Sequence, residues 1–158
     1  MKINNFSKCF IAIVLVEGVG ILSGLLTSAS VTTWYIGLEK PALNPPSWIF
    51  GPVWTMLYLL MAIAAFLIWK KGLQNKEVKV ALILFISQLV LNFFWSIIFF
   101  YLHNPAWAFV EIVVLWLTII ATIFVFFKVN RLAAYLLLPY ILWVSFAAYL
   151  NYGIWMLN

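Results

Sequence analysis

The sequence predicts an all-α integral membrane protein, a bundle of five transmembrane helices. The first observation behind this is composition, because 67% of the 158 residues are hydrophobic and only 8% are charged. A soluble domain has about 45–50% apolar and about 25% charged residues, so one water-soluble core could not hide this much apolar surface. The second is that the apolar residues fall into five runs, each close to the roughly 17–25 residues that a spanning helix needs. We therefore expect a single membrane domain.

The expected helices cover, in chain order, residues 9–28, 52–69, 79–102, 105–127 and 132–156. Lys2 and Lys8 precede the first apolar run, as basic residues precede the apolar segment of a signal peptide. This run is longer, however, than the apolar segment of a signal peptide, which has about 7–15 residues, and it contains Glu17. We therefore expect a retained helix. The gaps after the second, third and fourth runs are short, so consecutive helices there are expected to be antiparallel neighbours. Residues 29–51 form the one long connection.

Basic residues predict the orientation in the membrane. Five spans place the N-terminus and the second and fourth gaps on one side, and eight of the nine basic residues lie there: Lys2, Lys8, Lys70, Lys71, Lys76, Lys79, Lys128 and Arg131. Only Lys40 lies on the other side. Because cytoplasmic loops carry the excess of Lys and Arg, we expect a cytoplasmic N-terminus and an outside C-terminus. A bacterial cell membrane is the expected location.

Several chemistries are excluded by the residues present. The basic residues are spread over short gaps and form no continuous face, so no nucleic-acid partner is expected. There is no Gly-rich phosphate loop and no Cys or His cluster with metal spacing, and the chain has no Asp for a Ser-His-Asp triad. We therefore expect no cofactor and no metal, whereas the question of an enzymatic activity stays open.

The long connection combines aromatic residues with prolines. Its aromatic residues include Trp34, Tyr35 and Trp48, which suit a position at the lipid headgroups. Its prolines stiffen it by fixing φ. Two interpretations stay open at this point: an aromatic belt on a stiff loop, or a lid over a cavity.

Motifs spread over most of the chain resemble those of the tryptophan-rich sensory protein/translocator protein family, also called peripheral-type benzodiazepine receptors. The motifs are Trp34-Tyr35, Leu38-Glu39-Lys40-Pro41, Asn44-Pro45-Pro46 and Trp54, then Gln88-Leu89-Val90-Leu91-Asn92-Phe93-Phe94-Trp95, Trp107-Ala108-Phe109-Val110-Glu111 and Leu138-Pro139-Tyr140-Ile141-Leu142-Trp143. The family usually has Asp where this chain has Glu111. The resemblance implies a five-helix bundle, often a homodimer, with a cavity under the first loop. In the family that cavity binds porphyrins, such as protoporphyrin IX and haem-like tetrapyrroles, and benzodiazepine-type ligands.

Helical spacing independently points to a shared interior. Polar groups in a bilayer turn away from lipid toward the bundle interior, and stripes that mix aromatic with hydrogen-bonding residues occur on four of the expected helices. Such walls suit a flat apolar ligand. Trp54 and Trp143 are predicted to form opposed walls of a pocket. For Asn92 the alternative is a hydrogen bond between helices without any contact to a ligand. The expected ligand-binding residues are Tyr35, Pro45, Trp54, Tyr58, Asn92, Trp95, Trp107, Tyr140, Trp143 and Ala147.

Two carboxyl groups lie within the spans, and such residues are functional candidates by default. For Glu111 we expect a structural hydrogen bond near the outer end of the fourth helix, whereas the role of Glu17 stays open. Residues 20–24 read Gly-Ile-Leu-Ser-Gly, a close-packing signature. The expected function is a porphyrin receptor or sensor that aids tetrapyrrole transport or breakdown. Alternatives are a proton-coupled exporter that uses Glu17, and slow or light-dependent porphyrin degradation.

Overall fold

A computed structural model describes residues 4–158, all helices and connections without a strand in that range. The elements are α1 (Asn5–Thr32), α2 (Trp34–Gly37), the 3-10 turn η1 (Ser47–Ile49), α3 (Phe50–Trp69), α4 (Lys76–Ser96), the π-helical turn η2 (Ile97–Tyr101), α5 (Pro105–Val129), α6 (Arg131–Leu136) and α7 (Leu138–Leu157). Within the described residues, five helical stretches are long and apolar enough to span a membrane. This confirms the predicted fold class.

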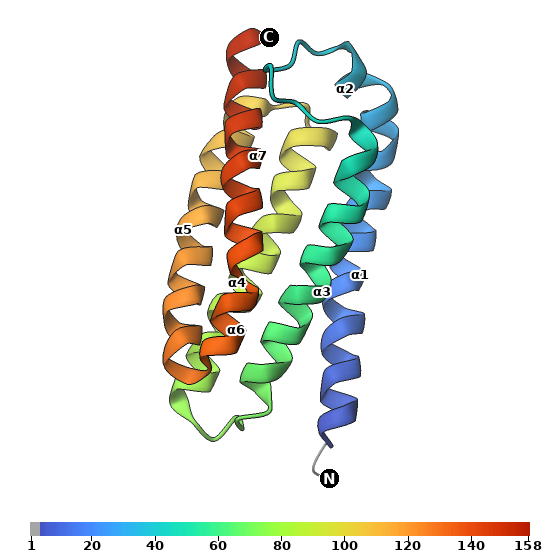
Figure 1. Cartoon of the computed structure of the whole chain (residues 1–158). Helices are drawn as coiled ribbons and strands as arrows, with labels where there is room; N and C mark the ends of the chain where they lie inside the picture. Colours follow the sequence, from blue (N-terminus) through green and yellow to red (C-terminus); the bar gives the residue numbers. More distant parts are fainter. Residues whose placement is uncertain (1–3) are drawn as a thin grey trace.

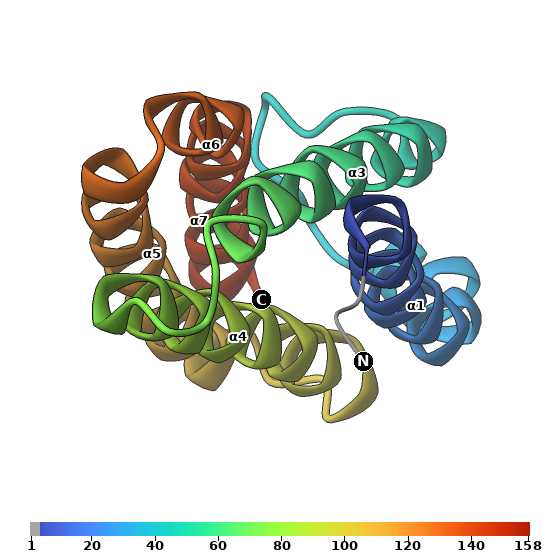
Figure 2. The same ribbon diagram turned by 90° about the horizontal axis from the view of Figure 1, so that it is seen from below.

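The five spans form one ring in which neighbouring spans are antiparallel, except α1 and α4, which run in the same direction (Figure 1). Around the ring, α1 packs against α3, and α3 packs against α6 and α7. Next, α7 packs against α5 and α5 against α4, and the loop end of α4 with η2 contacts α1 (Figure 2). The N-terminus lies at one end of the bundle and the C-terminus at the other (Figure 1). The end that carries residues 33–49 and the C-terminus is called the loop end below, and the opposite end the N-terminal end.

The first helix is longer than the predicted residues 9–28. It begins earlier because the Asn4 side chain accepts a hydrogen bond from the Ser7 backbone N–H at 2.7 Å and caps it. It ends later because hydroxyl side chains in its last turns, Ser28 and Thr32 among them, donate to carbonyls three or four residues back. This local bonding lets polar residues continue the helix. The connection to α3 is therefore shorter than the predicted residues 29–51.

The last span is interrupted near its start. α6 ends at Leu136 and α7 begins at Leu138, with Pro139 in its first turn. Proline has no N–H to donate and its ring collides with the carbonyl four residues back, so a continuous helix cannot pass through it. Pro139 thus accounts for the interruption between α6 and α7.

The two halves of the bundle are packed differently. Toward the N-terminal end, small residues of α3, such as Ala62, Ala64 and Ala65, are buried in one cluster with Ile68 and with Phe126 of α5. Small residues at helix interfaces are the usual means of close packing in membranes. Toward the loop end, α3 and α7 make few contacts, and the interior is hollow.

Orientation can be tested by labelling. On a Cys9→Ser background, single cysteines at exposed Lys76 and Lys128 are expected to react only with reagent on the cytoplasmic side, and one at exposed Ala42 only from outside. The reason is that the basic residues that predict a cytoplasmic side lie at the N-terminal end of the bundle. They are Lys8, Lys70, Lys71, Lys76, Lys79, Lys128 and Arg131, while Lys2 lies outside the described residues. Labelling of Lys76→Cys from outside in intact cells would reverse the assignment.

Candidate ligand cavity

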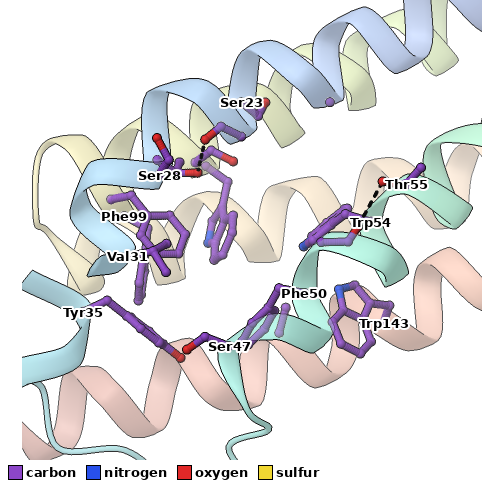
Figure 3. A pocket seen from close by; sticks show the side chains of 18 of the residues that line it. Ser23, Ser28, Val31, Tyr35, Ser47, Phe50, Trp54, Thr55, Phe99 and Trp143 are labelled. Atoms are coloured by element: carbon purple, nitrogen blue, oxygen red, sulfur yellow. Dashed lines mark hydrogen bonds between the residues drawn. The ribbon is translucent and has the colours of Figure 1, made fainter. Parts of the chain in front are cut away.

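The hollow at the loop end is a cavity of about 500 Å³. It lies between α1, α3, α4 with η2, and α7, and α2 reaches it from the loop (Figure 3). Residues from all these elements line it: Glu17, Gly20, Ile21, Ser23, Gly24, Thr27, Ser28, Val31, Thr32, Tyr35, Ser47, Phe50, Gly51, Trp54, Thr55, Tyr58, Trp95, Ser96, Phe99, Phe100, Trp143, Ala147, Leu150, Asn151 and Ile154. Most ligand pockets are similar concave sites, mainly apolar with a few polar groups.

One wall is the small-residue face of α1. Gly20, Ser23, Gly24, Thr27 and Ser28 recur at helical spacing and all line the cavity. A Cβ added to Gly20 would lie only 2.5 and 2.6 Å from two ring carbons of Tyr58. Gly20 therefore brings α1 against α3 within one chain, so the close-packing signature is used inside the bundle.

Aromatic residues of α3 and α7 form a second wall. The ring centroid of Phe50 lies 6.0 Å from that of Trp143, and the centroid of Trp54 lies 6.4 Å from that of Tyr140. Trp54 and Trp143 therefore both line the cavity along the seam between the neighbouring helices α3 and α7 (Figure 3). The Trp143 indole N–H is buried with no hydrogen-bond partner in the structure.

Across the cavity lie Trp95, Phe99 and Phe100 from α4 and η2. The Trp95 and Phe99 rings stack with centroids 5.3 Å apart. The wider π-helical turn changes the angle between successive side chains, and such turns occur frequently at functional sites. Trp95 Nε1 donates to Asn151 Oδ1 at 3.0 Å, so α7 holds this ring in place.

A buried hydrogen-bond chain lies below the cavity floor. The Tyr58 hydroxyl donates to Asn92 Oδ1, and the Asn92 amide donates to the Tyr140 hydroxyl at 3.1 Å. Asn92 and Tyr140 join three helices in this way but do not line the cavity, so their predicted place in its wall is wrong. The interhelical alternative for Asn92 is the arrangement observed.

The loop covers the cavity as a fixed lid. Tyr35 is buried at the cavity edge, and its hydroxyl donates to Asn44 Oδ1 at 2.7 Å. Burial raises the pKa of the Tyr35 hydroxyl above its usual value, although the Asn44 hydrogen bond opposes the shift, so the proton needed for this bond is retained. Trp48 is 74% exposed, as expected for an interfacial aromatic. The loop therefore combines both interpretations of the sequence.

The lid is also attached to the end of α7. The Asn158 side chain accepts from the Glu39 N–H and donates to the Glu39 carbonyl, both at 3.0 Å. A Cβ at Gly153 would lie 2.9 Å from two carbons of Pro41. These contacts keep the loop against α7, over the cavity mouth.

Pro45 lines a separate, more open hollow under the loop rather than the main cavity. This hollow shares Tyr35 and Ser47 with the main cavity, and it contains Lys40. The Lys40 ammonium group donates to the Leu38 and Ile36 carbonyls at 2.8 and 3.2 Å and lies 4.9 Å from the centre of the Tyr35 ring.

Two residues of α5 differ from their predicted roles. Trp107 is 66% exposed, because the interior face of α5 is the neighbouring apolar stripe that begins with Ala108 and Ile112. Its placement in the cavity is wrong. Both oxygens of Glu111 are buried without a hydrogen-bond partner among residues 4–158, so the expected structural bond is absent.

Six of the ten predicted residues therefore come together at the cavity: Tyr35, Trp54, Tyr58, Trp95, Trp143 and Ala147. Sequence reasoning missed Phe50, Phe99 and the small-residue wall of α1, and it left the role of Glu17 open. The spacing of Gly20, Ser23, Gly24 and Thr27 was a readable signal for that wall, since small residues mark the interior faces of membrane helices.

Comparison with known proteins decides the family. The family model described as TspO/MBR family matches residues 10–156. The chain belongs to the TspO/MBR family. This confirms the resemblance seen in the loop and helix motifs, and the five apolar spans agree with a multi-pass integral membrane protein.

The alignments with three curated relatives cover between 79% and 98% of the chain. It is 43% identical over 155 residues to the tryptophan-rich protein TspO of Archaeoglobus fulgidus, with 98% of this chain and 99% of the relative covered. It is 40% identical over 139 residues to the translocator protein of Sus scrofa, with 85% and 82% covered. It is also 37% identical over 125 residues to the tryptophan-rich sensory protein of Cereibacter sphaeroides, with 79% and 77% covered. That bacterial source agrees with the expected bacterial membrane.

Proposed function

We propose that this TspO/MBR protein is a membrane receptor or sensor that holds a porphyrin in the cavity under its loop. The supporting observation is the aromatic lining of a cavity of about 500 Å³, covered by a lid that is tied to α7. Aromatic faces stack on a planar macrocycle, which adds about 0.5–1.5 kcal/mol to simple apolar burial. Benzodiazepine-type ligands, which are also flat and apolar, fit the same walls.

Charge suggests how such a ligand is oriented. Protoporphyrin IX carries two carboxylates, and no basic residue lines the main cavity among the described residues. Lys40 is the basic residue near its mouth, in the hollow that shares Tyr35 and Ser47. An ammonium group has three N–H donors, and two of those on Lys40 already bond backbone carbonyls. We propose that the third N–H donates a hydrogen bond to a porphyrin carboxylate at the loop end.

This proposal is tested by titrating the purified protein with protoporphyrin IX and with its dimethyl ester, following Trp fluorescence. Both are expected to bind wild type, and Lys40→Met is expected to weaken only the free acid, by about three- to fivefold, the range of a partly exposed ion pair. The ester controls for any change in the lid itself. The titration is run in darkness and then in light, and bleaching of the bound porphyrin in light alone would reveal photochemical breakdown.

Lys70→Met is the matched control, because Lys70 lies at the N-terminal end beyond α3. It is expected to leave both affinities at the wild-type value. Absence of saturable quenching by either porphyrin would contradict the receptor function. Equal weakening of acid and ester in Lys40→Met would contradict the proposed orientation alone.

A proton-coupled exporter is the second candidate, and one observation favours it: Glu17 lines the cavity. An intramembrane carboxyl that can exchange a proton for a substrate is a usual component of such transporters. Uptake into protein-containing vesicles driven by an imposed pH gradient, and its loss in Glu17→Gln, would distinguish export from binding alone.

A further inference from the structure

The charge of the main cavity is unusual for a porphyrin site. Among the described residues that line it, Glu17 is the only one with a charged side chain. No hydrogen bond or ion pair of its carboxyl group is found within residues 4–158. An unpaired carboxylate away from water is costly, and in membrane helices such groups normally have a partner. The Glu17 carboxyl group is therefore free to pair with a cationic group of a ligand in the cavity.

The surroundings of Glu17 match a particular kind of cation. Glu17 is one helical turn from Gly20, which lies against the Tyr58 ring, and the Tyr58 ring centroid lies 5.6 Å from that of Trp54. Aromatic faces attract cations, and quaternary ammonium ions are recognised by aromatic residues in this way. A carboxyl group and aromatic faces thus occur together along the α1 and α3 side of the cavity.

A second polar group there also lacks a partner. Ser23 is only 6% exposed and lines the same cavity from α1 next to the Tyr58 hydroxyl, and no hydrogen bond of good geometry to its own hydroxyl is found within residues 4–158. Buried polar groups are usually bonded, so an exception next to a cavity indicates a group that a ligand or water would satisfy. Ser23 and Glu17 lie six residues apart on α1.

We propose that the cavity binds an aromatic organic cation, with its ammonium group against the Glu17 carboxylate and its ring system between the Trp54 and Phe99 walls. The cation belongs to a different ligand class from the porphyrin, and its binding does not depend on the proposed porphyrin binding. The cation supplies a charged partner for Glu17, while its apolar body uses the same walls.

A matched pair of probes tests the charge alone. (1-Naphthylmethyl)trimethylammonium and 1-(2,2-dimethylpropyl)naphthalene have nearly the same shape, with nitrogen in one replaced by carbon in the other. Both are titrated calorimetrically into protein in zwitterionic lipid nanodiscs, with empty nanodiscs as the reference. Wild type is expected to bind the ammonium ion at least tenfold more tightly than the neutral compound. Glu17→Gln is expected to reduce this preference to twofold or less.

Two further variants make the result specific. Glu111→Gln removes the other carboxyl within the spans, which does not line the cavity, and is expected to keep the full preference. Glu17→Asp keeps the charge and is expected to retain at least a threefold preference, which covers the case in which Glu17→Gln does not fold. Equal binding of the two probes by wild type, or an unchanged preference in Glu17→Gln, would overturn the proposal. Protoporphyrin titration of the same samples separates the two ligand classes, since either can fail while the other holds.

Discussion

Replacing Trp54 or Trp143 by alanine is expected to weaken protoporphyrin IX binding at least tenfold. Both indoles line the cavity along the seam between α3 and α7. Loss of one indole removes stacking worth about 0.5–1.5 kcal/mol and apolar contact worth about 1.5–3 kcal/mol for full burial. A tenfold change corresponds to about 1.4 kcal/mol, so even partial loss of these contacts reaches it. The measurement is the dissociation constant from Trp quenching in detergent or nanodiscs.

Two tryptophans outside the cavity are the controls for this experiment. Trp69 lies at the end of α3 farthest from the loop, where Lys8 sits 5.9 Å from its ring centre. Trp107 is exposed on the outer surface of α5. Trp69→Ala and Trp107→Ala are expected to bind porphyrin within twofold of wild type. If either weakens binding as much as Trp54→Ala, the ligand does not lie under the loop.

Gly20→Ala is expected to lower the free energy of unfolding by about 1–3 kcal/mol, the usual cost of overpacking a core. The added methyl carbon would overlap the Tyr58 ring, with atoms 2.5 and 2.6 Å away. The ring cannot turn aside easily, because its hydroxyl is held by Asn92 in the buried chain below the cavity. α1 and α3 must therefore separate. The thermal unfolding midpoint in detergent, read by helical circular dichroism, measures the effect.

The same substitution on the same helix provides the control. A Cβ at Gly18 or Gly24 would meet nothing within 4 Å, so Gly18→Ala and Gly24→Ala are expected to be neutral or slightly stabilising, given the higher helix propensity of alanine. In the double variant Gly20→Ala/Tyr58→Ala the clash is absent. The decrease in the free energy of unfolding should therefore be smaller than the sum of the decreases in the two single variants. An unfolding midpoint for Gly20→Ala equal to that of Gly24→Ala would show that α1 and α3 are not in this close contact.

The sequence by itself determined the five spans and the family, because both depend on local or linear information. A run of apolar residues must leave water wherever it is placed, so its length predicts a membrane helix without knowledge of its neighbours. The interruption near Pro139 was also predictable, since the missing N–H is a property of that one residue. Tyr35 was placed at the cavity correctly, whereas Pro45 of the same loop lies in the separate hollow.

Only the tertiary structure decided which face of each helix meets the cavity. Trp107 and Glu17 illustrate this: the aromatic residue predicted inside faces outward, and the carboxyl group with an open role lines the cavity. In a chain with 67% hydrophobic residues, lipid-facing and core-facing sides are both apolar, so periodicity hardly distinguishes them. Rotation of a helix about its axis is set by close packing, as at Gly20 and Tyr58, and by buried hydrogen bonds such as those of Asn92. Both join residues far apart in the chain, and both exist only once the helices have assembled.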